Sequence, residues 1–398
     1  MKFNLKKNGQ GTSETLKILY ISHLHPPRNQ PLESVGGMQN VSMQLVDALE
    51  RTEGVELQTI ILRSPWRGII IRTFLFLFTL LFRIPKADRE FQPDVILFSS
   101  MVTAGVIPFL TRKIKAPLVT INHGQDVTLP FWIYQKYLPH VFKKLSGVIS
   151  VSKATRQACI DRGLEPDKGV ALPNGLDSRK LDRMPDRGTA RDEIKRRFGL
   201  DEIDERYLLL TVGRQVKRKG HVWFINEVLP KISSDVTYLI VGDGPEHPEI
   251  RKAAEESGLK DHIVLAGRQS DEVLRMAYAA ADLFVMPNIP IEGDMEGFGI
   301  VLLEANQASV PAVAADLEGI RDVIEQGVNG YRVPHSRPSK FAEKVDQVLG
   351  MELESLSSSS RDYVMNRFSW DTVVLQYVDF LQKVRNGTVE SEKIKDPV

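Results

Sequence analysis

The chain has 398 residues, enough for two or three domains, and its 42% hydrophobic and 26% charged residues are typical of an ordinary globular protein. The net charge of +1 gives no general attraction for nucleic acid, and the single cysteine, Cys159, excludes an internal disulfide and favours a reducing compartment. The polar start of the chain predicts no secretory signal.

The charge is spread unevenly along the chain. Residues 1–180 carry a surplus of ten positive charges, and the remainder carries a surplus of nine negative charges. A basic N-terminal half fits an anionic acceptor or an anionic membrane surface. A chance sorting of surface charges explains the asymmetry equally well, so both interpretations stay open.

Short apolar runs alternate with helical patterns through the first 180 residues. Strands are predicted at 16–24, 55–62, 95–99, 118–121 and 147–151, and helices at 37–51, 104–113, 131–144 and 153–163. This alternation predicts a doubly wound parallel sheet of the α/β class, which binds ligands at the carboxyl ends of its strands. His123 follows such a strand, and it is either a donor to a sugar hydroxyl or a loop histidine with a structural partner.

Residues 69–84 are unusually apolar. Arg72 and Arg83 bracket ten residues, eight of which are large and apolar. The run is too short to span a bilayer. Two interpretations remain: a helix packed on the sheet, or an amphipathic segment in a membrane interface with its arginines at the head groups.

The alternation restarts after a polar, charged segment. Strands are predicted at 207–212, 236–241, 262–266, 283–286, 312–314 and 329–333, and helices near 337–348, 358–367 and 371–384. The first of these strands ends in Gly213 and Arg214, and the basic run Lys217–Lys219 precedes Gly220 and a helix. A strand end, glycine, cations and a helix start together favour a phosphate site, although the P-loop spacing is absent. A solvated basic turn is the alternative.

Two carboxylates, Glu296 and Glu304, stand eight positions apart around a glycine-rich helix start. Gly297 and Gly299 precede the apolar run that begins at Ile300. Glycine lets a ligand approach the backbone, and the N–H groups of a helix start attract anions. This stretch therefore predicts a diphosphate cradle flanked by hydroxyl-binding carboxylates, and a core helix with solvated or capping glutamates is the alternative.

These features together resemble the retaining family 4 glycosyltransferases, of the GT-B architecture, over most of the chain from about Leu16 to Val384. Seven pieces follow the family's order: Gly36-Gly37; His123-Gly124 with Asp126; Val151-Ser152; Pro173-Asn174-Gly175; Gly213-Arg214 with Lys219-Gly220; Val241-Gly242-Asp243-Gly244-Pro245; and Glu296-Gly297-Phe298-Gly299 with Leu303-Glu304-Ala305. One such piece is a weak signal, whereas seven in order are specific.

The resemblance implies two Rossmann-like domains with the active site in the cleft between them. The implied boundaries are a tail at 1–15, an acceptor-binding domain at 16–180, a linker at 181–206, a nucleotide-sugar-binding domain at 207–368, a helix at 369–385 with the option of crossing back to the first domain, and a tail at 386–398. A cytoplasmic protein, peripheral on the membrane through 69–84, is the expected location.

The resemblance also implies roles for individual residues. Arg214 and Lys219 would neutralise the donor diphosphate, Glu296 would hold a donor-sugar hydroxyl, and Glu304 would hold the ribose. Backbone N–H groups of Phe298, Gly299 and Ile300 would meet sugar and phosphate. His123 would face the donor sugar, and Gly37 would approach the diphosphate or the acceptor. The catalytic set is thus His123, Arg214, Lys219 and Glu296.

The implied reaction moves a hexosyl group from a nucleotide-diphosphate sugar to a glycan or lipid-linked acceptor, in cell-surface polysaccharide or glycolipid biosynthesis. The chain contains no Asp-x-Asp, so we expect a metal-independent reaction with no cofactor beyond the donor. Two positions depart from the family pattern: Glu318 and Ser309 stand where the family often has glycine. Glu318 adds a negative charge near the expected diphosphate.

Other functions are kept as alternatives. A non-catalytic relative that binds a nucleotide sugar or a partner protein is the main one, and the intact set of Arg214, Lys219, Glu296 and Glu304 argues against it. A nicotinamide dehydrogenase predicts Gly-x-Gly-x-x-Gly after the first strand, where this chain has Ser22-His23-Leu24-His25. A sugar phosphorylase or an epimerase on the same fold stays open.

Overall fold

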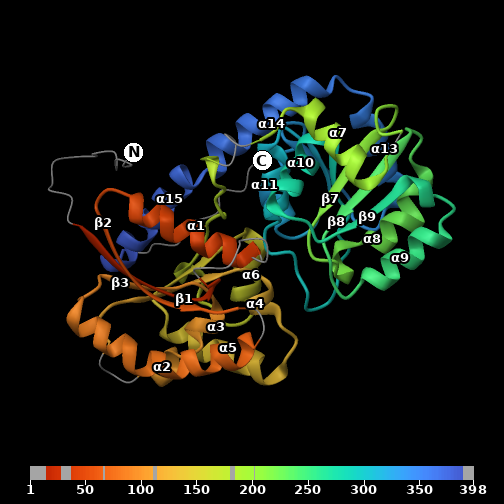
Figure 1. Ribbon diagram of the computed structural model, residues 1–398. Helices are drawn as coiled ribbons and strands as arrows, with labels where there is room; N and C mark the ends of the chain where they lie inside the picture. Colours follow the sequence, from red (N-terminus) through yellow and green to blue (C-terminus); the bar gives the residue numbers. More distant parts are fainter. Residues whose placement is uncertain are drawn as a thin grey trace. The chain divides into compact units, whose positions relative to one another are not determined.

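The computed structural model describes residues 15–27, 37–65, 68–110, 114–179, 184–200 and 202–388 (Figure 1). Gly36, almost all of the expected N-terminal tail, residues 180–183 and 201 around the expected linker, and the last ten residues lie outside the described residues. No helix within these ranges is long and apolar enough to cross a membrane.

The chain forms two compact units. Unit 1 runs to Gly175 and resumes at Trp370, and unit 2 spans Leu176–Ser369. The described part of each unit contains a six-stranded sheet in which every strand pairing is parallel. With helices flanking both sheets, the molecule has the two Rossmann-like domains and the GT-B class that the sequence predicts.

The sheet of unit 1 has the strand order β2-β1-β3-β4-β5-β6. Its strands are β1 (Leu16–His25), β2 (Val55–Arg63), β3 (Val95–Phe98), β4 (Leu118–Asn122), β5 (Gly147–Ser150) and β6 (Gly169–Ala171). Its longer helices are α1 (Gly37–Arg51), α2 (Ile69–Glu90), α5 (Trp132–Lys144), α6 (Lys153–Ile160) and α15 (Trp370–Arg385). In Figure 1, α1 and α15 cover one face of this sheet, and α2, α3 (Met101–Ala104) and α5 lie on the other.

Burial explains why these short runs form strands. Every residue of β3 and β5 is buried, as expected for parallel strands covered on both faces. Of the helix predicted at 104–113, residues 111–113 lie outside the described residues, and the described part is α3 followed by a short 3-10 helix, η2 (Ile107–Phe109). Gly105 and Pro108 stand at this break, and both residues are poor in a helix interior.

Helix α2 buries one stripe and exposes the opposite one. Phe76, Leu80 and Ile84 are buried at a spacing of four residues, which places them on one face of the helix. Phe74 and Phe78 are 72% and 59% exposed on the other side. The helix continues through Pro85 to Glu90, beyond the apolar segment 69–84. The packed-helix interpretation is therefore confirmed, and an apolar surface remains exposed.

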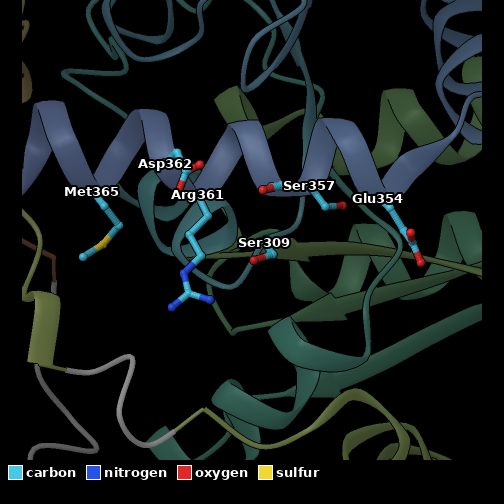
Figure 2. Close-up of a pocket in the computed structure, with 7 residues that line it drawn as sticks. Ser309, Glu354, Ser357, Arg361, Asp362 and Met365 are labelled. Atoms are coloured by element: carbon cyan, nitrogen blue, oxygen red, sulfur yellow. The ribbon is translucent and has the colours of Figure 1, made fainter.

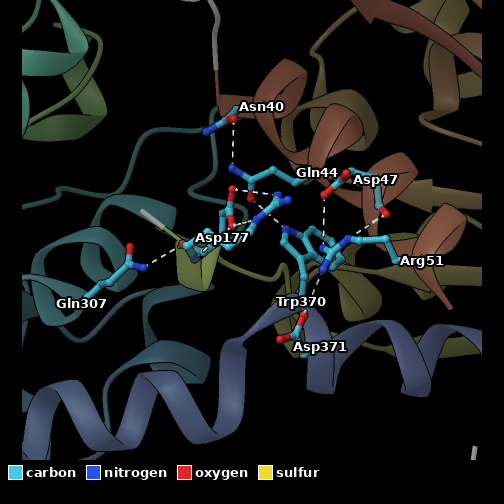
Figure 3. A network of polar contacts seen from close by, with 9 residues as sticks. Asn40, Gln44, Asp47, Arg51, Asp177, Gln307, Trp370 and Asp371 are labelled. Carbon is cyan, nitrogen blue, oxygen red and sulfur yellow. Dashed lines mark hydrogen bonds and ion pairs between the residues drawn. The ribbon is translucent and has the colours of Figure 1, made fainter. Parts of the chain in front are cut away.

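Trp370 anchors the return of the chain to unit 1. Its indole Nε1 donates to the side-chain oxygen of Gln44 on α1 at 2.8 Å, and Gln44 donates to Asn40 at 3.0 Å (Figure 3). The next residue, Asp371, pairs with Arg51 of α1 at 3.8 Å. Because Trp370 is only 2% exposed, packing adds to these polar contacts.

The sheet of unit 2 has the strand order β12-β11-β10-β7-β8-β9. Its strands are β7 (Tyr207–Val212), β8 (Val236–Val241), β9 (Ile263–Gly267), β10 (Leu283–Met286), β11 (Ala312–Ala315) and β12 (Gly330–Val333). Its longer helices are α7 (Arg187–Phe198), α9 (His247–Glu256), α10 (Asp271–Ala280), α11 (Ile300–Gln307), α13 (Pro338–Leu349) and α14 (Leu353–Phe368). In this order β7 lies beside both β8 and β10, so the segments after β7 and β10 share one edge of the sheet.

Trp370→Ala is expected to lower the free energy of unfolding of unit 1 by about 3–5 kcal/mol, because it removes a buried indole and leaves a cavity. Urea denaturation followed by circular dichroism measures the change. The matched control, Asp371→Ala, removes only a half-exposed ion pair and should cost about 0–1 kcal/mol. Equal, small losses in the two variants would show that Trp370 does not anchor α15.

Candidate functional site

A tight basic turn follows β7 and directs one lysine inward. Lys217–Lys219 form a single 3-10 turn that ends at Gly220. Gly220 has φ 67°, and a Cβ there would lie 2.0 Å from the carbonyl oxygen of Pro287. Only glycine fits this contact. The turn is thus pressed against the segment after β10, and Lys219 is buried with 8% of its surface exposed.

Lys219 forms a buried ion pair with Glu296. Its Nζ lies 2.6 Å from Oε2 of Glu296, and the Asn288 side-chain amide donates to the same oxygen at 3.1 Å. Arg218 stands 3.7 Å from that oxygen and 3.6 Å from Asp294. One carboxylate oxygen therefore gathers a lysine, an amide and an arginine from the segments after two adjacent strands.

The electrostatics keep this pair ionised. Burial alone would raise the pKa of Glu296, but Lys219 and Arg218 outweigh it, so this pKa lies below its ordinary value. Burial lowers the pKa of Lys219, and Glu296 restores part of that loss. A negative carboxylate and a positive ammonium are consequently held together at neutral pH.

Helix α11 begins directly after Glu296-Gly297-Phe298-Gly299. Gly299 is its N-cap with φ 84°, and the first helical residue is Ile300. The Phe298 side chain is buried against Phe368 of α14 at 6.1 Å between ring centroids. A helix start carries positive potential, which suits an anionic group. The predicted glycine-rich helix start is confirmed.

Glu304 lies one turn into α11 and accepts a hydrogen bond from Tyr278. The Tyr278 hydroxyl donates to Oε2 of Glu304 at 2.9 Å. Burial and the neighbouring carboxylate hold the pKa of Tyr278 well above its ordinary value, so the hydroxyl stays a donor. Glu304 is half-buried, with its carboxylate oriented by this bond.

The predicted residues of unit 1 lie at the carboxyl end of its sheet. His123 directly follows β4; its Nε2 donates to the carbonyl of Ser99 at 2.9 Å, and Asp126 accepts from its backbone N–H at 2.8 Å. His23 lies near the carboxyl end of β1, within the strand, and burial and the nearby His123 lower its pKa to about 4. Gly37 is the first residue of α1. The loop histidine therefore has its structural partner, with a ring that is half-buried.

The structure brings together most of the residues predicted for unit 2. Lys219 and Glu296 touch, and Phe298, Gly299 and Ile300 lead from Glu296 into α11. Arg214 is exposed after β7, and Arg218 is the arginine beside Glu296.

Sequence reasoning missed three polar partners of this cluster: Arg218, Asn288 and Tyr278. Arg218 belongs to the basic run, and Asn288 stands two residues after β10, so a strand-end rule could have found both. No local pattern connects Tyr278 with Glu304, because their contact joins α10 to α11.

The pocket in Figure 2 lies elsewhere in unit 2. Ser309 and residues of α14, among them Glu354, Ser357 and Arg361, line it, and none of the predicted site residues does. Among the residues the structure describes, no three His, Cys, Asp or Glu side chains gather in a way that could hold a metal ion.

Two models of known protein families match the sequence. Residues 35–180 match Glycosyltransferase Family 4, and residues 206–351 match Glycosyl transferases group 1. The GDP-mannose-dependent alpha-(1-6)-phosphatidylinositol monomannoside mannosyltransferase of Mycobacterium tuberculosis is 32% identical, over 75% of this chain and 78% of that protein. The alpha-D-kanosaminyltransferase of Streptomyces kanamyceticus is 30% identical, over 53% of each chain.

Solved structures share the fold at low sequence identity. The catalytic domain of starch synthase IV from Arabidopsis thaliana, bound to ADP and acarbose, has a TM-score of 0.74 and 15% identity, and covers 94% of this chain and 100% of that one. The Anabaena protein HepE in complex with UDP has a TM-score of 0.69 and 18% identity, and covers 92% and 100%.

Lys219→Met is expected to lower the free energy of unfolding of unit 2 by about 3–5 kcal/mol at neutral pH, because Glu296 then stays buried without its cation. The pKa of Glu296 should rise in the variant, whereas it is lowered in the wild type. The difference in unfolding free energy between the wild type and the variant should therefore shrink as the pH falls through the ordinary glutamate pKa of 4.5. Denaturation at a series of pH values measures both effects.

The control for this prediction is the double variant Lys219→Met/Glu296→Met, which removes both charges. It should be more stable than Lys219→Met alone, since no buried charge is left unpaired. A double variant as unstable as the two single losses added together would contradict a coupled ion pair.

Proposed function

Because the chain belongs to glycosyltransferase family 4, we propose that it moves a hexosyl group from a nucleotide-diphosphate sugar to a glycan or lipid-linked acceptor, with retention of anomeric configuration and without a metal. Its glycosyltransferase class rests on family membership. The observation that carries the finer proposal is the buried Lys219–Glu296 pair beside the start of α11. That arrangement offers a cationic turn, a helix N-terminus and a hydroxyl acceptor at one edge of a sheet.

The proposed sugar transfer requires cationic groups beside the leaving diphosphate. Breaking the anomeric bond leaves an oxocarbenium-like sugar and a diphosphate anion. In this proposal Arg214, Arg218 and Lys219, with the N–H groups at the start of α11, stabilise the diphosphate where its charge grows. The acceptor attacks from the same face, and the leaving phosphate takes its proton, which gives retention. The cations of the chain take the place of a metal.

In this proposal the two glutamates bind different parts of the donor. Glu296 accepts a hydrogen bond from a hydroxyl of the donor sugar, and Glu304 accepts one from the nucleotide ribose. His123 faces the donor sugar from unit 1, and Gly37 approaches the diphosphate or the acceptor.

The names of the relatives support a nucleotide-sugar donor and suggest polysaccharide or glycolipid synthesis. The mycobacterial relative is named for GDP-mannose and a phosphatidylinositol monomannoside. Because the two solved structures hold UDP and ADP, the base has to be found by experiment. We propose a cytoplasmic enzyme, because the single cysteine, Cys159, favours a reducing compartment.

Thermal shift with UDP, GDP and ADP and their hexose conjugates, with and without divalent metal, tests the donor. One nucleotide should raise the Tm independently of metal, and Lys219→Ala and Glu304→Ala should abolish the shift. Lys219→Ala should also lower kcat by about 10²-fold or more, comparable to loss of one preorganised electrostatic group. No shift with any nucleotide in a folded wild type would favour the non-catalytic alternative.

We propose also that α2 rests on an anionic membrane as a peripheral contact. Ile70, Phe74, Phe78 and Phe82 are each at least 59% exposed along this helix, and Arg72, Arg83, Lys86 and Arg89 are exposed with them. Of its two acidic residues, Asp88 is buried, accepting from the backbone N–H of Lys115. Apolar side chains and cations on one helix suit the interface of an anionic bilayer.

Co-sedimentation with vesicles of mixed phosphatidylcholine and phosphatidylglycerol tests this contact. The triple variant Phe74→Ser/Phe78→Ser/Phe82→Ser should lose binding, whereas Tyr207→Ser, a control at an exposed aromatic residue of unit 2, should keep it. Phe76 is left intact because it packs in the core. Vesicle binding by the triple variant that equals binding by the wild type would contradict the membrane proposal.

A further inference from the structure

Glu318 has a backbone conformation that glutamate rarely adopts. Its φ is 46°, in the left-handed region where a Cβ crowds the backbone. Residues held in such a conformation persist where surrounding contacts over-determine them, and they are frequent at functional sites. The contacts of Glu318 therefore indicate what the conformation serves.

Glu318 and Gly319 hold both polar groups of the Glu296 backbone. The Glu318 carboxylate accepts a hydrogen bond from the backbone N–H of Glu296, and the N–H of Gly319 donates to the Glu296 carbonyl at 3.1 Å. A Cβ on Gly319 would lie 2.2 Å from the carbonyl oxygen of Gly297, so the two segments touch backbone to backbone. This clamp fixes Glu296 independently of its contact with Lys219.

The clamp also places a second acid beside the ion pair. Glu318 is half-buried and faces Glu296, Asp294 and Arg218. Burial raises the pKa of Glu318, the Glu296 N–H and Arg218 oppose that rise, and the two neighbouring acids add to it. A carboxylate in this position disfavours an anion such as a diphosphate nearby, so electrostatics alone does not explain its place.

We propose that Glu318 is a positioning residue for the donor sugar, which acts by fixing the backbone of Glu296 so that the Glu296 carboxylate is in place before the donor binds. The proposal rests on the proposed function, since it takes Glu296 as the sugar-binding group. In this proposal Glu318 strengthens binding of the sugar part of the donor and does not strengthen binding of the nucleotide. Pre-organisation of one group gives affinity by removing the cost of ordering it on binding.

This assignment predicts a selective effect. The sugar advantage is defined here as the ratio of the Kd of the nucleoside diphosphate to the Kd of its sugar conjugate. Loss of the clamp should lower this ratio by about tenfold, the value of one hydrogen bond to a charged group. The Kd of the plain nucleoside diphosphate should stay unchanged or become tighter, because a negative charge is removed.

Isothermal titration of the full chain measures both Kd values, with whichever of UDP, GDP or ADP the wild type binds. Glu318→Gly removes the carboxylate contact of the clamp, leaves the Gly319 N–H contact in place and relieves the left-handed backbone, so the variant is expected to fold. Glu318→Gln keeps an oxygen that can accept the Glu296 N–H, and it should retain the sugar advantage. Ser336→Gly, which relieves φ 57° at an exposed turn of unit 2, is the matched control and should change neither Kd.

Three results would overturn the proposal: equal loss of both affinities in Glu318→Gly, no change in either, or a Glu318→Gln variant that behaves like Glu318→Gly. The first would assign Glu318 a general structural role, and the last would assign its effect to charge. Failure of the wild type to bind any nucleotide sugar would contradict the proposed function itself and is seen before any variant is made.

Discussion

A buried ion pair governs the architecture of unit 2. Lys219 and Glu296 are 8% and 7% exposed, and removing either partner of a buried ion pair is strongly destabilising. The pair joins the segment after β7 to the segment before α11, which are 77 residues apart in the sequence. Two close contacts lie beside that meeting point: the Gly220 turn against Pro287 and the Glu318–Gly319 clamp on the Glu296 backbone.

The parallel sheet makes this meeting possible. Strands β7 and β10 pair directly, so the loops after their carboxyl ends lie at one edge. Lys219 comes from the first loop, and Asn288 and Glu296 come from the second. If the proposed function holds, a donor bound here would meet charged groups that are already ordered, at buried positions where electrostatic interactions are strong.

The fold could be predicted from the sequence because apolar runs and helical periods are local patterns. The strands at 207–212, 236–241 and 283–286 were predicted at their observed bounds. The choice between Arg214 and Arg218 could not be made in this way. Both follow the same strand, but Arg214 is exposed and Arg218 lies beside Glu296, a contact between segments that are far apart in the sequence.

Two further features could not be predicted from the sequence, because each depends on packing and not on a local pattern. Helix α2 runs through Pro85, where a local rule ends the helix, because its buried stripe continues to Ile84 and Ala87. The sequence identified Glu318 only as an extra charge. Its clamp on Glu296 involves a left-handed backbone next to the close contact between Gly319 and Gly297, and no periodicity in the sequence indicates such a contact.

The return of the chain at Trp370 has a consequence for biosynthesis. Unit 1 is made of two stretches separated by the whole of unit 2, and α15 packs on α1 and β3 of unit 1. Because translation proceeds from the N-terminus, all of unit 2, which is continuous in sequence, is synthesised before α15. Unit 2 is able to fold during synthesis, whereas unit 1 keeps the apolar surface that α15 covers open until α15 itself has been synthesised.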